Sequence, residues 1–164
     1  MIITIPLVII ICVVFALVFL FVKTIDRRKW LTILVSLALT PLVYFYAVYP
    51  MINIFTNFHH QKHFTMELWQ ETPALRYELS DDLISSEKLI GKTKEEIENL
   101  LGKAEWLSWN EKAKAHNDNK WNYSLGIEPG AFNTKKECLE VVFTDGLVTN
   151  VNPYKETITF DAKE

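Results

Sequence analysis

The chain has 164 residues, of which 49% are hydrophobic, and a formal net charge of −3. These averages are those of a water-soluble protein, but they combine two different parts. Residues 1–54 hold four basic residues and one acidic residue, whereas residues 55–164 hold 13 basic and 19 acidic residues, a net charge of −6. An acidic C-terminal part argues against a nucleic-acid ligand, because binding to phosphates requires clustered Lys and Arg. Its length of about 110 residues allows one small hydrophobic core.

Two apolar runs dominate the N-terminal part, and they cover residues 2–22 and 30–49. As helices rising about 1.5 Å per residue, each would extend about 30 Å, the thickness of the hydrocarbon layer of a bilayer. The sequence therefore predicts a transmembrane helical hairpin in residues 1–52, with a loop at 23–29. The first run has no basic stretch before it and no small-residue cleavage site after it, so we expect a retained helix and not a signal peptide.

Basic residues mark one end of this hairpin. The short loop contains Lys23, Arg27, Arg28 and Lys29, and the next basic residue is Lys62. Positively charged loops stay in the cytoplasm. We therefore expect a multi-pass protein of the bacterial cytoplasmic (inner) membrane whose C-terminal domain is extracytoplasmic.

The second run contains several features that bear on how it packs. Trp30 and Tyr49 stand near its ends, where aromatic rings favour the headgroup level of a bilayer. Pro41 lacks a backbone donor and should kink the helix. Ser36 and Thr40 are small polar residues four positions apart, which either face the first helix or are simply tolerated in the interior.

Residues 53–63 have the composition of a juxtamembrane linker. His59 and His63 are four residues apart, with His60 between them, and on a helix that spacing can hold a metal ion. No carboxylate or further histidine nearby completes a site. The sequence therefore favours a polar linker, and we expect no metal or other cofactor.

A small α+β domain is predicted for residues 64–152, and its first helix begins near Pro73. Proline suits a first helical turn, and Thr72 before it would be the N-cap. The apolar stripe of this helix consists of Leu75, Leu79 and Leu83. Arg76 falls off the stripe, so we expect it on a solvated helix face, where it could pair with Ser80 or Asp81.

The second helix of the domain has the clearest signals in the chain. Thr93 and Glu96 have the spacing of a capping box. Gly102 is suited to end the helix in a left-handed conformation. The buried side is formed by Ile97, Leu100 and Leu101.

After Gly102 the apolar period changes from about 3.6 to 2, which is typical of strands. Strands are predicted at residues 105–109, 121–125, 139–143 and 147–151, and successive hairpin connections make the sheet antiparallel. Residues 153–164 form a predicted C-terminal tail, with a further edge strand conceivable at 157–160. Cys138 is expected to be a small buried residue of the third strand, too distant from Cys12 for a disulfide.

Aromatic residues of the first two strands provide the candidate binding residues. Trp121 and Tyr123 share a face with Leu125, which assigns them to the core. Trp106 and Trp109 are on opposite faces, so one of them should be exposed. Tryptophan is enriched in binding hot spots, and the exposed candidate is Trp109, beside a predicted polar loop at 111–119.

Taken in order, these segments resemble the BamE-like (SmpA/OmlA) family and, more loosely, the repeats of the beta-lactamase inhibitor protein. The matching residues are Asp82-Leu83-Ile84, Leu89 to Thr93, Glu96-Ile97, Leu100 to Gly102, Tyr123 to Gly126, Leu139, Val141, Phe143 and Asp145 to Val148. The resemblance covers roughly residues 64–152. It implies two helices packed on an antiparallel sheet of three or four strands, a role in binding other proteins, and no catalytic residues.

Function is accordingly expected to be non-catalytic. The sequence has no G-x-S-x-G motif, glycine-rich phosphate loop or paired Cys-His motif. The expected role is an envelope assembly, scaffold or accessory factor whose partners are the lipid bilayer and another protein. Two alternatives remain open: an inhibitor or immunity-type binder of a secreted or incoming protein, and a metal or small-molecule sensor that uses the histidine cluster.

Overall fold

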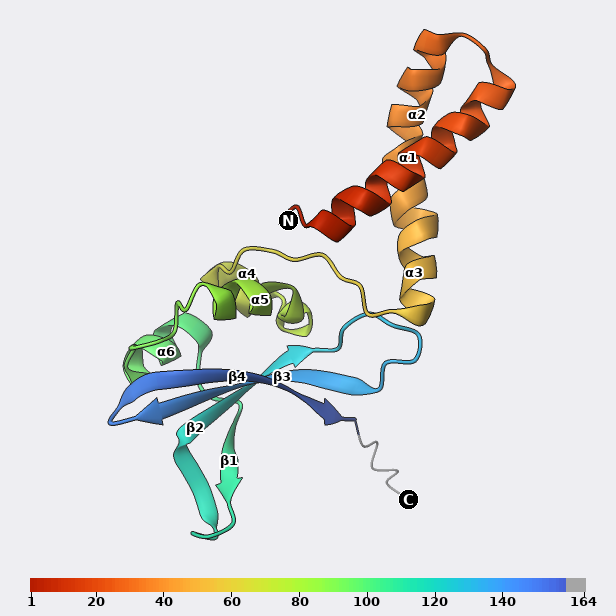
Figure 1. The fold of residues 1–164 in the computed structure, drawn as a ribbon. Helices are drawn as coiled ribbons and strands as arrows, with labels where there is room; N and C mark the ends of the chain where they lie inside the picture. Colours follow the sequence, from red (N-terminus) through yellow and green to blue (C-terminus); the bar gives the residue numbers. More distant parts are fainter. Residues whose placement is uncertain (159–164) are drawn as a thin grey trace. The chain divides into compact units, whose positions relative to one another are not determined.

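The computed structural model describes residues 1–158, which form two compact units (Figure 1). The helical unit comprises Ile2–Phe58 together with Pro129–Phe132. The α+β unit comprises His59–Glu128 and the chain from Asn133 onward. The predicted α+β class is confirmed.

The helical unit is a hairpin of two long helices. Helix α1 covers Ile5–Ile25. The second is continuous over Lys29–Phe55 and consists of α2 (Lys29–Val43), a π-helical turn η1 (Tyr44–Val48) and α3 (Tyr49–Phe55). Both are long and apolar enough to cross a membrane.

The second helix departs from the prediction in two ways. It continues six residues past Tyr49, so residues 53–55 of the predicted linker are helical instead; apart from Asn53, residues 51–55 are apolar. The π-helical turn lies between Pro41 and Pro50. Each proline lacks the N–H that a regular helix would use, and the wider turn accommodates that loss.

Small polar residues of α2 pack against α1. Four buried residues recur at every fourth position of the second helix: Thr32, Ser36, Thr40 and Tyr44. The buried side of α1 is formed by Leu7, Val14, Val18 and Val22. The hydroxyl of Thr40 donates to the carbonyl O of Ser36 at 2.7 Å, so its polarity is satisfied within its own helix. Ser36 and Thr40 therefore face the first helix, as small residues do where apolar helices approach closely.

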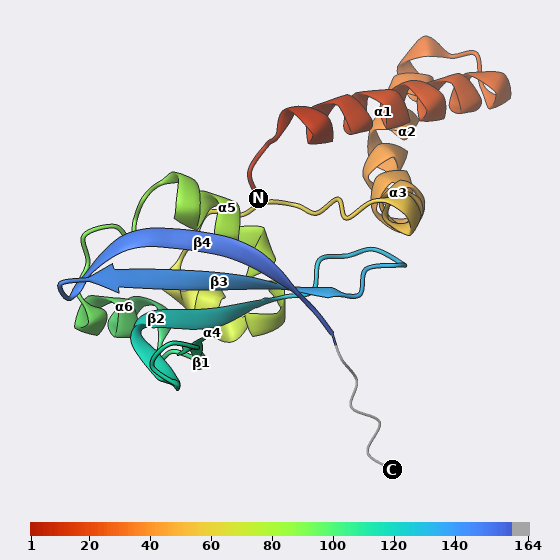
Figure 2. The same ribbon diagram turned by 60° about the horizontal axis from the view of Figure 1, so that its bottom comes forward.

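The α+β unit contains three α-helices and a four-stranded sheet. The helices are α4 (Met66–Glu71), α5 (Tyr77–Ser85) and α6 (Lys94–Leu101), with a 3₁₀ turn η2 at Pro73–Leu75. The strands are β1 (Trp106–Asn110), β2 (Ala115–Gly126), β3 (Lys135–Thr144) and β4 (Leu147–Thr157). They pair antiparallel in the order β1-β2-β3-β4. All helices of the unit cover the same face of the sheet (Figure 2).

The core of this unit lies between the helices and that face. Its members come from α4, α5, α6 and the three long strands, and they include Trp69, Leu79, Leu83, Ile97, Tyr123, Leu139 and Val141. Trp121 is half-buried and packs edge-on against Phe143, so the assignment of Trp121 and Tyr123 to the core is confirmed. Cys138 is fully buried, and both cysteines are free thiols.

Helix α6 has the predicted caps. The hydroxyl of Thr93 accepts from the N–H of Glu96 at 3.3 Å, and a carboxylate oxygen of Glu96 accepts from the N–H of Thr93 at 2.8 Å. Gly102 ends the helix with φ of 87°. Its last carbonyls are paired too, because the indole of Trp69 donates to Leu101 at 2.9 Å and the phenol of Tyr123 donates to Gly102 at 3.0 Å.

The segment before α5 differs most from the prediction. Helix α4 was not predicted. Thr65 is its N-cap, and Trp69 is its residue in the hydrophobic core. The predicted cap Thr72 instead donates its hydroxyl to the carbonyl O of Leu68, so η2 has no side-chain cap. Leu75 lies in η2 and is 37% exposed, and the buried stripe of α5 begins at Tyr77.

Arg76 is also wrongly predicted, because its side chain is buried rather than solvated. Its Nε donates to the carbonyl O of Trp69 at 2.8 Å, and its Nη1 lies 2.6 Å from a carboxylate oxygen of Glu105 and 3.2 Å from the carbonyl O of Ser124. Its guanidinium also stacks 4.5 Å from the centre of the Trp69 ring. One buried side chain thus joins α4, the residue before β1, and β2.

Three strands are longer than predicted, and one of them, β3, begins at Lys135 instead of residue 139. Strand β2 begins at Ala115, so half of the predicted polar loop is strand. Strand β4 reaches Thr157, where it pairs with Lys135, so residues 153–157 belong to the sheet and not to a tail. Residues 153–157 are mostly polar, so their sequence does not predict a strand. Pairing with β3 makes them one. Residues 159–160 of the conceivable edge strand lie outside the described residues.

Candidate functional site

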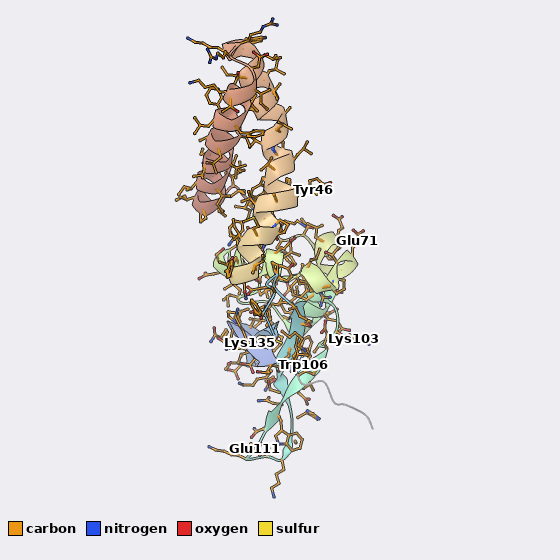
Figure 3. All side chains as sticks on the ribbon, turned by 90° about the vertical axis from the view of Figure 1, so that its right-hand side faces the viewer. Tyr46, Glu71, Lys103, Trp106, Glu111 and Lys135 are labelled. Atoms are coloured by element: carbon orange, nitrogen blue, oxygen red, sulfur yellow. The ribbon has the colours of Figure 1, made fainter. Side chains whose placement is uncertain are left out.

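The candidate residue Trp109 lies on the hairpin formed by β1 and β2. Its side chain is 53% exposed, as expected, and its ring meets that of His116 edge-on with centres 5.3 Å apart. The turn is shaped by Asn110, whose side-chain oxygen accepts from the N–H groups of Lys112 and Ala113 at 3.0 and 3.2 Å. The hairpin extends away from the rest of the sheet, with Glu111 at its far end (Figures 1 and 3). The exposed indole of Trp109 therefore lies on a hairpin that projects from the sheet and has an ordered turn.

Trp106 lies at the start of the same strand, on the sheet face that the helices leave uncovered. It is half-buried, and the ammonium of Lys136 lies 4.5 Å from the centre of its ring. A cation so placed is attracted to the face of an indole. The two tryptophans therefore differ in exposure: Trp106 is half-buried beside Lys136, whereas more than half of the Trp109 side chain is open to solvent.

A network of polar side chains lies on the sheet face that no helix covers, and Asn122 is at its centre. The amide of Asn122 donates to the hydroxyl of Ser108 at 3.0 Å and accepts from the phenol of Tyr154 at 2.9 Å. Ser108 in turn donates to Glu140 at 2.9 Å, which Lys120 approaches at 3.1 Å. Asn122 is almost completely buried although no helix covers it. The network joins all four strands.

The protonation states of this network follow from its contacts. Burial raises the pKa of Tyr154, so the phenol stays protonated and donates. Burial also acts to raise the pKa of Glu140, but hydrogen bonds from Ser108, Lys120 and Asn152 outweigh it and lower the pKa below its ordinary value. A satisfied network of this kind holds a surface in one conformation.

Sequence reasoning missed most of this face. Tyr154 was assigned to the tail, and no role was predicted for Asn122. Period 2 places Asn152 and Tyr154 on one face of the strand, but the sequence after Val151 has no apolar–polar alternation that would reveal the strand. Strand β1 was predicted one residue early, at Glu105, whose carboxylate instead binds Arg76.

Two open grooves lie near the start of β1, one beside Glu105, the residue before the strand, and one beside Leu107. One has a volume of about 410 Å³ and is lined by Pro73, Ala74, Glu105, Ser124, Gly126, Ile127 and Lys136. The other, of about 430 Å³, is lined by Lys94, Glu98, Lys103, Ala104, Leu107, Asp118 and Trp121. Both have charges of both signs and apolar floors. Such linings suit polar and apolar contacts with another protein.

The histidines of the linker do not share a site. Residues 56–65 form no helix, so the i, i+4 spacing of His59 and His63 does not place them on one face. His59 packs against Tyr77 and lies 3.9 Å from Glu128, whereas His63 lies 2.9 Å from Asp82. Within residues 1–158 no group of three or more His, Cys, Asp or Glu side chains is arranged to hold a metal ion.

The second half of the linker is fixed along α5. The backbone N–H of Lys62 donates to the carbonyl O of Glu78 at 2.7 Å, and the Lys62 ammonium lies 2.6 Å from the Glu78 carboxylate. Two residues later, the N–H of Phe64 donates to Asp82 at 2.9 Å. The second half of the predicted linker is therefore part of the α+β unit, which begins at His59.

Asp82 is the centre of this attachment. Hydrogen bonds from Lys88, from the N–H of Phe64 and from His63 hold the pKa of its carboxyl well below the usual range. Asp81 does not share this site, because its carboxylate accepts from Gln61 instead. The two adjacent carboxylates thus serve two separate points of the linker and do not form an acid–base pair.

The fold and surfaces define a class of protein: an α+β unit joined to a hairpin of two long apolar helices. No protein family, curated protein or solved structure matches the chain. The BamE-like resemblance therefore stays a prediction. Function has to be inferred from the residues and contacts described above.

Proposed function

We propose that this chain is a two-span protein of a bacterial cytoplasmic membrane that presents its α+β unit outside the cytoplasm to bind another protein. The membrane part of the proposal is supported by two helices of 21 and 27 residues whose outward surfaces are apolar. The orientation is supported by four basic residues around the turn between them and by their absence from residues 30–61.

The observation that carries the binding function is the exposed Trp109 on a short edge strand. Strand β1 pairs with β2 on one side only, within the residues that the structure describes. Its other edge offers backbone groups for pairing, and open grooves adjoin Glu105 and Leu107 at the start of the strand. An exposed indole beside free backbone groups is suited to anchor a protein partner.

The BamE-like resemblance points to the same function. A small antiparallel sheet with helices on one face is the architecture that the resemblance implies. On that reading the protein is an assembly, scaffold or accessory factor of the cell envelope. It would hold its partner at the membrane surface and would carry out no chemistry of its own.

The orientation predicts the behaviour of reporters fused after Glu164. A phosphatase that folds only outside the cytoplasm is expected to be active there, and a fluorescent protein that folds only inside is expected to stay dark. The matched control is a fusion after Arg28, in the basic turn, for which the two signals should exchange. An active cytoplasmic reporter after Glu164 would reverse the topology and contradict the envelope role.

The binding surface predicts cross-linking from position 109. A photoreactive residue there, in cells and in the full-length chain, is expected to give one dominant protein adduct, and the same residue at the exposed Glu95 on α6 should give none. Once the partner is known, Trp109→Ala should weaken its binding by about 2 kcal/mol, roughly 30-fold in dissociation constant, as for a typical hot spot. Trp109→Phe, which keeps an aromatic ring, should lose less.

Two results would contradict this surface. One is the absence of an adduct at position 109 while residues on the helices cross-link strongly, which would place the interaction in the hairpin. The other is a partner that cross-links at position 109 but whose binding affinity is unchanged by Trp109→Ala. An adduct with a secreted enzyme would instead identify the protein as an inhibitor.

A further inference from the structure

The loop between β2 and β3 contains a segment that does not pack with the sheet. Residues Pro129–Phe132 belong to the helical unit. The N–H of Ala131 donates to the carbonyl O of Asn53, in the last turn of α3, at 2.9 Å. The last carbonyls of a helix have no partner within it, so this hydrogen bond caps α3. The loop is closed at its base by the amide of Asn133, which donates to the carbonyl O of Glu128 at 3.0 Å.

Two of the strongly exposed aromatic rings of the helical unit lie next to this hydrogen bond. Phe132, next to the capping residue, is 80% exposed, and Phe55, at the end of α3, is 85% exposed. Met51, one turn earlier, is exposed as well. The hydrogen bond between Ala131 and Asn53 brings these residues to the same end of α3, and apolar side chains exposed together indicate a surface that another phase or molecule covers.

Helix length places these apolar side chains at the headgroup level of a bilayer. Asn53 is 23 residues after Trp30, a rise of about 35 Å at 1.5 Å per residue. The hydrocarbon core is about 30 Å thick, and about 40–45 Å with its headgroups. If Trp30 marks the cytoplasmic boundary, the end of α3 lies a few ångströms beyond the opposite boundary. Aromatic rings concentrate in that layer.

We propose that the loop 129–132 is a second membrane contact, in which Phe132 inserts into the outer headgroup layer beside the end of α3. The occupant of this surface is the phospholipid bilayer itself. Residues 127–134 contain no Lys or Arg and one acidic residue. The attachment is therefore apolar and does not depend on anionic lipids. The inference rests on the proposed membrane-spanning function of the hairpin.

The test measures the depth of a spin label at Ala131→Cys, with Phe132 intact, in the full-length chain. The background is Cys12→Ala. Cys138 stays unlabelled because it is fully buried and burial raises the pKa of its thiol to about 11. The protein is reconstituted in phosphatidylcholine vesicles, and collisions of the label with oxygen and with a water-soluble nickel complex are compared. Reference labels are placed at Leu37, which is exposed midway along the second helix, and at Glu111.

The label at 131 is expected to collide with the nickel complex several-fold less often than the label at 111. Adding Phe132→Ser should bring the two close together, whereas Phe132→Trp should preserve the difference. Replacing a fifth of the lipid with phosphatidylglycerol should change nothing, because the contact is apolar.

The failures of the two proposals are distinguishable. A label at 37 in lipid, with the label at 131 as water-exposed as that at 111, overturns the second contact and leaves the membrane-spanning function standing. A shielded label at 131 that is indifferent to Phe132→Ser overturns the role of Phe132. A water-exposed label at 37 overturns the membrane-spanning function and the contact together.

Discussion

Replacing Arg76 with methionine should lower the free energy of unfolding of the α+β unit by about 3–4 kcal/mol. Methionine keeps much of the apolar stem but leaves the carbonyl oxygens of Trp69 and Ser124 without the donor that now reaches both. It also leaves the carboxylate of Glu105 without its cation at 2.6 Å. Glu105 is 37% exposed and can rehydrate in part, which keeps the cost at the lower end of the range for a broken buried pair.

The measurement is a urea titration of the full-length protein in detergent micelles, followed by tryptophan fluorescence. Trp69 is fully buried against the guanidinium and reports on this unit. Arg76→Lys is the informative comparison, because a lysine keeps the charge and loses the planar fork that serves several acceptors at once. It should recover less than half of the loss. A destabilisation below about 1 kcal/mol for Arg76→Met would contradict the proposed importance of the buried cation.

The burial of Arg76 could not be predicted from the sequence. The spacing of Leu75, Leu79 and Leu83 predicted one helix, and on it Arg76 faces solvent. In the structure the segment is divided into η2 and α5, and Leu75 leaves the stripe. The division depends on Trp69, which inserts between the sheet and α6. Two of the contacts that fix its ring, with Leu101 and Tyr123, are with residues 30 or more positions away in sequence, and no local pattern contains them.

Local chemistry predicted well the elements that it determines by itself. The capping box of Thr93 and Glu96 and the terminating Gly102 involve neighbours within one turn, and all are present. The length and apolar character of the two N-terminal helices were equally accessible. Alternation correctly assigned Trp121 and Tyr123 to the core.

Strand ends were predicted poorly for a physical reason. Residues 115–120 and 153–157 are mostly polar and have little strand propensity. Their strand conformation depends on paired neighbours: Ala115 and His116 pair with β1, Lys120 pairs with β3, and residues 153–157 pair with β3 throughout. The uncovered sheet face was missed in consequence, since Tyr154 contributes to it only if β4 continues past Val151. The exposure of Trp109, which depends only on its own strand, was predicted correctly.

Gly126→Ala should be nearly as damaging as the loss of Arg76, at about 3 kcal/mol or more. Gly126 has φ of +95°, a conformation that alanine adopts only at a cost. A Cβ added there would overlap the carbonyl O of Ala74, a backbone atom of η2 that has no rotamer with which to yield. The end of β2 would have to move away from η2, and the floor of the groove beside β1 would move with it.

Gly146→Ala is the matched control for this substitution. Gly146 has φ of +83°, and nothing lies within 4 Å of an added Cβ. It should therefore cost only the conformational part, about 1 kcal/mol. The difference between the two variants in the same urea titration measures the contact with Ala74. Equal losses would show that η2 adjusts freely to the end of β2.

The two substitutions act on one junction, and they should not be additive. Arg76 reaches Ser124, and Ala74 meets Gly126, so both connect the segment from η2 to α5 with the last residues of β2. Once the alanine at 126 has displaced β2 from η2, the guanidinium has already lost one acceptor. The double variant should therefore lose at least about 0.5 kcal/mol less than the sum of the single losses. Strict additivity would mean that the buried cation and the glycine stabilise independent parts of the unit, and that β2 can leave η2 without disturbing Arg76.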